Sequence, residues 1–446
     1  MSMAVGPSDF TDRASARMID GRPASRAWQV VPSILASMAS IEASFALFVF
    51  SGRFKGLPGL RQSPVDLTLF FLVATFGLVG WGLTSGRLSP LRLTPPVVLM
   101  LLFCEVAAMS IFWSSLDSIN LDKLARFLLL TGSGFFLACL LAQDPVRRKR
   151  LIGWVAWLSL GIVLYYLYYR YVLGIDTMTE YWIDRETDGG DNYLEYGENA
   201  AILLMILVTM ATLGSWRHIL VAAPGSGAAC CVLLSVGSRG PLAFSILSVV
   251  ILGLVLAIRS RSGFHRSGRR LAGFAACIVV LGLVGYVAAN SGTDAEKEGF
   301  HTIERIRTQL SGEDTLSMDL RAGGRTLAFN QWLRKPLLGW GIGEFRVQDN
   351  FLRYPHNTLL EVLMEMGLVG ACLYAAVLMD CILRCWRVAR APPTGWPDIA
   401  MIVLFLTTLC WEMTVEGYLA DDRIFFTFIG MVVGSRVVQR PALIAK

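Results

Sequence analysis

The chain has 446 residues, of which 54% are hydrophobic and only 17% are charged, and its mean hydropathy is +0.54. Soluble globular proteins carry about 25% charged residues, so this composition excludes a soluble protein with two or three polar-surfaced domains, and it excludes a disordered chain. The apolar residues fall in blocks of about 20, the length that crosses the hydrocarbon core of a bilayer as a helix. The composition predicts an all-α, polytopic membrane protein.

The net charge of +6 would suggest a nucleic-acid partner in a soluble protein. Here the basic residues lie in short loops between apolar blocks, so we interpret them as determinants of membrane topology and expect no nucleic acid. The nine cysteines lie in or beside apolar blocks, so the sequence predicts neither a disulfide framework nor a zinc site.

We predict about 12 transmembrane helices from the apolar blocks. Blocks six and seven are separated only by Trp216 and Arg217. The blocks are 31–50, 68–86, 95–113, 124–142, 151–173, 199–215, 218–236, 240–258, 271–290, 358–380, 398–416 and 424–440.

The loops after blocks four, eight and ten are rich in arginine, which places them, and both termini, in the cytoplasm. The loop after block five has eight acids and one arginine, as expected of an outer loop. The predicted organisation is a cytoplasmic tail (1–28), membrane helices one to nine (29–290), an outer loop (291–357), membrane helices ten to twelve (358–440) and a cytoplasmic tail (441–446).

The outer loop 291–357 is long enough to fold or to act by itself. Its second half, residues 321–353, has six cationic residues and only two acids. Apolar residues at 328, 329, 332 and 333 have helical spacing, which predicts an amphipathic helix at the membrane interface.

Two outer segments contain residues suited to chemistry. Arg239 lies in Gly237-Ser238-Arg239-Gly240-Pro241, which is either a tight turn with a snorkelling arginine or a phosphate-gripping guanidinium. His356 precedes Asn357 at the outer mouth of block ten. A lone interfacial histidine is often structural, but Asn357 is a good N-cap, and the positive helix end favours the neutral imidazole that a general base requires.

Several acids lie at membrane depth, where a carboxylate usually faces a cavity or a basic partner. They are Glu42, Glu105, Glu361, Glu365, Glu412 and Glu416.

Residues 197–380 resemble the O-antigen ligase and polymerase superfamily. The resemblance rests on Ser238-Arg239-Gly240, on Arg325, on Pro336-Leu337-Leu338-Gly339-Trp340-Gly341, and above all on His356-Asn357-x-x-Leu360-x-x-x-x-Glu365-x-Gly367-Leu368-x-Gly370. Members often have a Pro-Asn pair before the sixth span, where this chain has Gly197-Glu198-Asn199, which leaves the role of residues 174–199 open.

The resemblance implies transfer of a glycan from an undecaprenyl diphosphate carrier at the periplasmic face of the bacterial inner membrane, with no metal or other cofactor. If the protein is a ligase, the acceptor is a sugar of the lipid A–core. An O-antigen or exopolysaccharide polymerase and a protein O-oligosaccharyltransferase are the alternatives. A transporter would predict two repeated six-span halves, which the sequence lacks.

The resemblance also assigns roles to individual residues. His356 would take the proton of the acceptor hydroxyl and give direct displacement with inversion, while Asn357 and Glu365 would support the site. Arginines would hold the diphosphate, namely Arg239 and Arg325 with Arg305, Arg307 or Arg321 as additions.

Overall fold

The computed structural model describes residues 40–55, 64–174, 193–260, 301–311, 316–349, 352–391, 395–415 and 417–435. In this part of the chain 82% of residues are helical and no strand occurs, which confirms the all-α class. The predicted span 271–290, the two tails and most of the loop 174–199 lie outside the described residues.

Within the described ranges, nine helices are long and apolar enough to cross a membrane. Two shorter helices, α2 (Ile41–Lys55) and α19 (Arg423–Gly434), fall on predicted blocks one and twelve. Every predicted block except 271–290 overlaps a described helix, and the total of 12 spans stays a prediction. The nine are α3 (Leu67–Thr84), α4 (Pro95–Ser110, extended to Trp113 by one 3₁₀ turn), α5–α6 (Ser118–Ala142, with a π-helical segment at Phe127–Gly132), α7 (Pro145–Tyr171), α9 (Tyr193–Leu213), α10 (Trp216–Ser235), α11 (Arg239–Ser260), α17 (Thr358–Arg390) and α18 (Trp396–Thr414).

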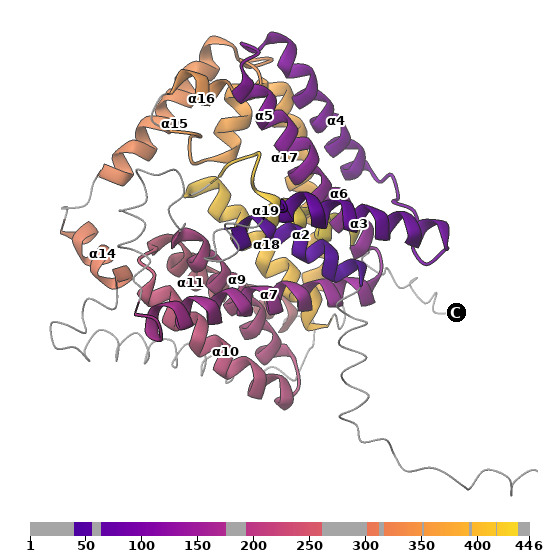
Figure 1. Cartoon of the computed structure of the whole chain (residues 1–446), viewed down its shortest axis with the longest axis vertical. Helices are drawn as coiled ribbons and strands as arrows, with labels where there is room; N and C mark the ends of the chain where they lie inside the picture. Colours follow the sequence, from indigo (N-terminus) through magenta and orange to yellow (C-terminus); the bar gives the residue numbers. More distant parts are fainter. Residues whose placement is uncertain are drawn as a thin grey trace, which may run out of the picture.

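The outer loop contains three further helices, α14 (His301–Leu310), α15 (Leu316–Arg334) and α16 (Glu344–Gln348). Figure 1 shows α14 and α15 along one flank of the helix bundle. Helix α15 covers the segment predicted to be amphipathic, and there Ala328 is buried whereas Phe329 and Leu333 are exposed, but over its full length α15 does not separate polar from apolar residues onto two faces. The exposed apolar side chains are suited to a membrane interface.

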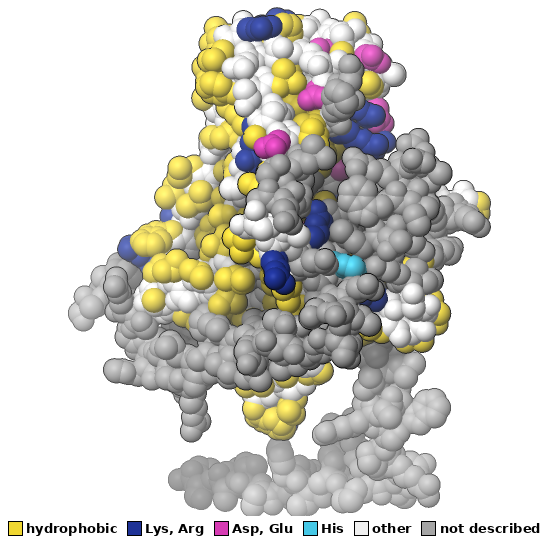
Figure 2. Space-filling model, turned by 90° about the vertical axis from the view of Figure 1, so that its left-hand side faces the viewer, with side chains coloured by type: hydrophobic (Ala, Val, Ile, Leu, Met, Phe, Trp, Pro, Cys, Tyr) yellow, Lys and Arg dark blue, Asp and Glu magenta, His cyan; other side chains and the backbone are white. Residues whose placement is uncertain are grey.

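The bundle has a buried interior and an exterior with many exposed apolar side chains. The most apolar stretch of α9 is 78% buried, whereas that of α3 is only 28% buried. Exposed apolar side chains on α3 and α4 are therefore suited to contact with lipid. Figure 2 shows broad hydrophobic surface on the side of the molecule that faces the viewer.

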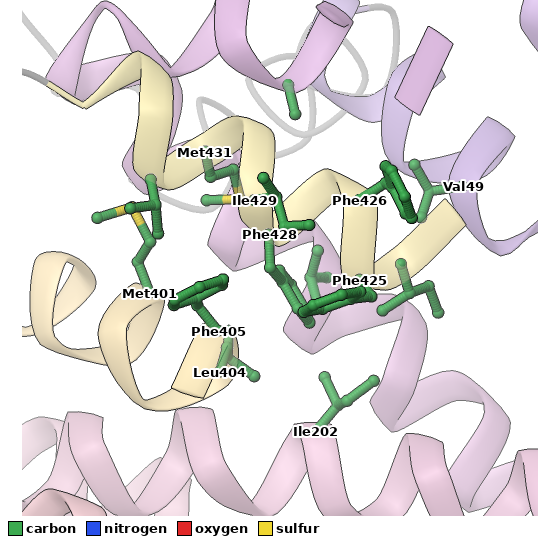
Figure 3. Close-up of a cluster of buried hydrophobic side chains, with 14 of the residues drawn as sticks. Val49, Ile202, Met401, Leu404, Phe405, Phe425, Phe426, Phe428, Ile429 and Met431 are labelled. Carbon is green, nitrogen blue, oxygen red and sulfur yellow. The ribbon is translucent and has the colours of Figure 1, made fainter. Parts of the chain in front are cut away.

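Helix α19 packs against α6 and α18 in the interior of the bundle. Gly430 and Gly434 lie directly against the backbone of α6, so that a Cβ at either position would overlap a carbonyl oxygen. Such small residues allow two membrane helices to approach closely. Beside them the rings of Phe405 and Phe425 are parallel, with centroids 6.2 Å apart (Figure 3).

Helix α17 has a break that positions the outer loop. Gly367 has φ +63° and ψ −162°, a conformation that only glycine adopts readily. The break leaves backbone groups of α17 without helical partners, and the segment 336–341 supplies them. Leu368 N donates to Pro336 O at 2.8 Å, and Gly341 N donates to Glu365 O at 2.8 Å. The glycine-rich motif of the outer loop is thus a docking segment for α17.

Candidate active site

His356 and Asn357 form the start of α17. The Asn357 side chain caps the helix, since its Oδ1 accepts a hydrogen bond from Leu360 N at 2.9 Å, as the sequence predicted. His356 has φ +54°, in the left-handed region that a non-glycine residue seldom adopts. The surrounding contacts therefore hold His356 at this sharp entry into the helix.

Arg325 of α15 reaches this turn. Its Nη2 donates to the carbonyl oxygens of His356, at 3.4 Å, and of Thr414 at the end of α18. Its Nε is buried without an acceptor among the described residues. Burial and the neighbouring Arg321 guanidinium lower the pKa of Arg325. The guanidinium is therefore held by neutral carbonyls beside a second cation, and a bound anion would relieve both the charge and the missing acceptor.

Arg239 and Arg305 form a second cationic pair. Arg239 Nη1 donates to Arg305 O at 3.1 Å, and Arg305 Nη1 donates to Gly237 O at 3.1 Å. Thr302 joins the same turn, because Gly237 N donates to Thr302 Oγ1 at 2.9 Å. These bonds place α14 against the start of α11, so the loop helix supplies one cation and the membrane helix the other.

The C-terminal end of α18 connects the two cationic pairs. Gly240, next to Arg239, packs against the indole of Trp411 and against Val415. One turn of α18 also presents the Thr414 carbonyl to Arg325 and the Met413 carbonyl to Asn357 Nδ2. The last carbonyls of a helix lack internal partners and carry partial negative charge, so they suit a guanidinium and an amide donor.

The imidazole of His356 lies against a short row of aromatic rings. The centroids of His356 and Tyr354 are 4.5 Å apart, and Tyr354 stacks on Tyr418 with centroids 4.8 Å apart. The ammonium of Lys123 lies 5.3 Å from the centroid of Tyr418. Burial raises the pKa of Tyr418 to about 12, so its phenol stays protonated at neutral pH.

The row ends on a buried ionic cluster. Lys123 Nζ lies 2.5 Å from a Glu361 carboxylate oxygen and 2.7 Å from Glu365, and all three side chains are almost fully buried. Glu361 also accepts from Leu419 N at 2.9 Å, which fixes the loop that carries Tyr418. Glu365 is therefore a member of this buried ionic cluster, paired with Lys123.

The structure brings together most of the predicted site. Arg325 donates a hydrogen bond to the backbone of His356, and Arg321 lies beside Arg325. Arg239 donates a hydrogen bond to the backbone of Arg305. Arg307 is exposed on α14 and has no described contact with the other site residues. No group of three or more His, Cys, Asp and Glu side chains in the described ranges is arranged to hold a metal ion.

The sequence pattern did not reveal several residues of the site. Lys123 stands near the start of an apolar block, where a lysine reads as an interfacial anchor. Tyr354 and Tyr418 are 64 positions apart and carry no motif. The glutamates at membrane depth were a signal for buried partners, but nothing in the sequence identified Lys123 as the partner.

Part of the chain matches a known protein family. Residues 224–375 match the O-antigen ligase family, a stretch that begins in α10 and ends in α17. No curated protein matches the chain. The matched third of the chain contains Arg239, Arg325 and His356, the residues on which the resemblance rested. This match supports the resemblance of the chain to the O-antigen ligase and polymerase superfamily.

Proposed function

We propose that this protein is an O-antigen ligase that transfers a glycan from undecaprenyl diphosphate to a sugar hydroxyl of lipid A–core. The reaction takes place at the periplasmic face of the inner membrane and needs no metal. The observation that best supports the proposal is the bond from Arg325 to the backbone carbonyl of His356, because it joins a guanidinium, a group suited to binding phosphate, to the residue that carries the candidate base. The family match supports a lipid-linked glycan as substrate, and the long apolar helices support a membrane setting.

The donor already carries its own leaving group. The anomeric carbon is bonded to a lipid diphosphate, so breaking that bond needs neutralisation of charge and no protonation by an acid. Arg325 and Arg239 supply planar guanidinium groups that can each grip two phosphate oxygens. Arg305 and Arg321 lie next to them and add positive potential, while Arg307 stays an outer candidate.

The acceptor hydroxyl needs a base. The neutral imidazole of His356 takes the hydroxyl proton as the oxygen attacks the anomeric carbon from the face opposite the diphosphate. The C–O bond to the acceptor forms as the C–O bond to the diphosphate breaks, which gives inversion. General-base catalysis of this kind contributes roughly 10²–10⁴-fold in rate.

A deletion strain tests the function and separates it from its alternatives. We expect a gel of surface polysaccharide to lose capped lipopolysaccharide while full-length polymer accumulates on the lipid carrier. Capping by a single repeat unit would instead identify a polymerase. Normal lipopolysaccharide together with unglycosylated protein would identify a protein O-oligosaccharyltransferase, and an unchanged strain would contradict all three.

A further inference from the structure

Four elements of the fold meet at the ammonium group of Lys123. Its Nζ lies 2.5 Å from Glu361 Oε1 and 2.7 Å from both carboxylate oxygens of Glu365. Glu361 Oε2 also accepts a hydrogen bond from Leu419 N at 2.9 Å. Glu365 Oε1 also accepts a hydrogen bond from Phe345 N at 3.4 Å. The cluster therefore ties α5, α16 and α17 to the loop that connects α18 with α19.

The cluster depends on Lys123 because it holds two carboxylates on one face of a helix. Glu361 and Glu365 lie one turn apart in α17, and both are completely buried. Two buried carboxylates repel each other, and removal of the cation that pairs with them leaves their charge uncompensated. Lys123 is buried as well, so solvent offers these charges little screening. We therefore expect the loss of Lys123 to displace the elements that the cluster joins.

The loop between α18 and α19 is fixed on two further sides. The carbonyl of the buried Ala420 accepts a hydrogen bond at 2.7 Å from Thr131 Oγ1, in the π-helical segment that follows α5. Gly417 packs so closely on Thr358, the first residue of α17, that a Cβ at this position would overlap it. These contacts flank Tyr418 on both sides in the sequence, so the backbone that carries its ring is held in place.

A row of rings connects this cluster to the imidazole of His356. The ammonium of Lys123 lies 5.3 Å from the centroid of the Tyr418 ring, within the range of a cation–π contact. Tyr354 stacks on Tyr418 at an interplanar angle of 23°, and the imidazole of His356 lies against Tyr354 with ring centroids 4.5 Å apart. The backbone of His356 is held by Arg325, so the row acts on the His356 side chain. Rotation of the imidazole is therefore limited by a ring that rests on Tyr418.

We propose that Lys123 and Tyr418 are positioning residues that orient the imidazole of His356 toward the acceptor hydroxyl. The inference rests on the proposed transferase function, in which His356 is the base. Lys123 holds the start of α17 and the loop together, and Tyr418 passes the position of that loop to Tyr354. A general base must lie within hydrogen-bond distance of the proton it takes. A displacement of about 1 Å can cost roughly 10²-fold in rate, so small shifts in the row should slow transfer.

The chemical reactivity of His356 tests the orientation without any transfer assay. Diethyl pyrocarbonate acylates imidazole nitrogens, and mass spectrometry of the purified full-length protein gives the rate at each histidine separately. We expect Tyr418→Ala to raise the rate at His356, because Tyr354 loses its stacking partner and the imidazole becomes freer to move. Tyr418→Phe keeps the ring and should react at the native rate. His218, whose Nδ1 is hydrogen-bonded to Ser215 Oγ at 2.8 Å, serves as the internal reference.

Lys123→Met tests the other end of the row and should also raise the rate at His356. If this variant does not fold, Tyr418→Ala carries the test, because it leaves the ionic cluster complete. Tyr165→Ala is the matched control, since Tyr165 is partly buried like Tyr418 and stacks on Tyr169 in α7 with ring centroids 5.8 Å apart. Its rate at His356 should equal that of the native protein.

Kinetics separate positioning from binding. Tyr418→Ala should lower kcat for transfer by roughly 10²-fold, the cost of a misplaced reacting group. The KM for the carrier-linked glycan should stay close to native, because the arginines hold the diphosphate in the proposed mechanism. Tyr418→Phe should restore kcat, since the ring and not the hydroxyl makes the stacking contact. Tyr165→Ala should leave both constants unchanged.

Three results would overturn the inference. The first is a native rate of acylation at His356 in Tyr418→Ala. The second is a faster acylation in that variant with an unchanged kcat, because transfer would then not depend on the orientation of the imidazole. The third is a Tyr418→Phe variant as impaired as Tyr418→Ala. If acylation behaves as expected but even the native protein transfers no glycan in any assay, the proposed function fails while the control of His356 by Tyr418 stands.

Discussion

At Arg325 the guanidinium is held by backbone carbonyls and not by a carboxylate. The kind of acceptor matters. A carboxylate would neutralise the guanidinium and compete with a phosphate, whereas carbonyl oxygens orient the guanidinium and leave its positive charge available. The buried acids Glu361 and Glu365 nearby are paired with Lys123.

Arg239→Lys should impair transfer nearly as much as Arg239→Ala, by roughly 10²-fold if one oxyanion-binding donor is lost. The reason is geometric, since an ammonium cannot grip two phosphate oxygens in one plane or reach the Arg305 carbonyl in the same way. The measurement is transfer from carrier-linked glycan to lipid A–core in membranes. Arg217→Lys, at a cation that lies over Trp216, is the control. Full activity in Arg239→Lys would show that Arg239 only anchors the membrane surface.

His356→Ala should abolish transfer while the protein remains inserted and still binds the carrier lipid, because the arginines hold the diphosphate. The expected loss is roughly 10²–10⁴-fold in rate. His356→Gln separates catalysis from structure. Near-normal turnover in that variant would reject the general base and leave the diphosphate-binding role of the arginines intact.

At the scale of single elements, the break in α17 and the glycine-rich segment of the outer loop form one unit. Gly339 and Gly367 both have positive φ, and each lies so close to the other's segment that a Cβ would overlap backbone atoms. Gly341 and Gly343 fit in the same way against the corner between α4 and α5. A Cβ at any of these glycines would overlap a neighbouring segment, so the motif serves to pack these segments closely together.

Gly367→Ala should destabilise the protein, because the new Cβ would overlap the Leu337 carbonyl and alanine disfavours φ +63°. A strained backbone of this kind costs on the order of 1–3 kcal/mol before the steric overlap is counted. Thermal unfolding in detergent measures the effect. Gly323→Ala is the matched control, since Gly323 lies in α15 with nothing within 4 Å of its added Cβ. An equal Tm for the two variants would contradict this account of the break.

At the scale of the whole molecule, the candidate site lies where the ends of several helices meet. The start of α11, the start of α17 and the end of α18 supply its residues, together with α14 and α15, which run along one flank of the bundle (Figure 1). This arrangement requires all of these ends to lie on one side of the membrane. The alternation of basic loops in the sequence predicts the same side for each of them.

Cysteine labelling with an impermeant reagent tests this topology. A cysteine at Ser311, exposed after α14, should be labelled from the periplasm, whereas one at Lys149, exposed near the start of α7, should not. The native cysteines are first replaced or blocked. Permeabilised cells should label both positions, which shows that each cysteine is reactive. The reverse pattern in intact cells would place the candidate site in the cytoplasm and exclude a periplasmic reaction.

The sequence by itself determined the fold class of the protein and indicated the polar residues of the candidate site. Apolar blocks of membrane-spanning length predicted the all-α fold, because the backbone of a spanning segment must satisfy its hydrogen bonds internally. The motif around Arg239, Arg325 and His356 indicated the superfamily, and Asn357 was identified as an N-cap from its residue type and position. These inferences need only local information.

Only the tertiary structure showed which groups contact these polar side chains and the break in α17. Hydropathy cannot show that Lys123 pairs with Glu361 and Glu365, more than 200 positions away, or that α18 ends where Arg325 and Asn357 need acceptors. Gly367 looks like any other glycine in an apolar helix until the segment 336–341 is placed beside it. Burying a charge or breaking a helix is unfavourable unless a specific partner compensates it, and the partner is supplied by the fold.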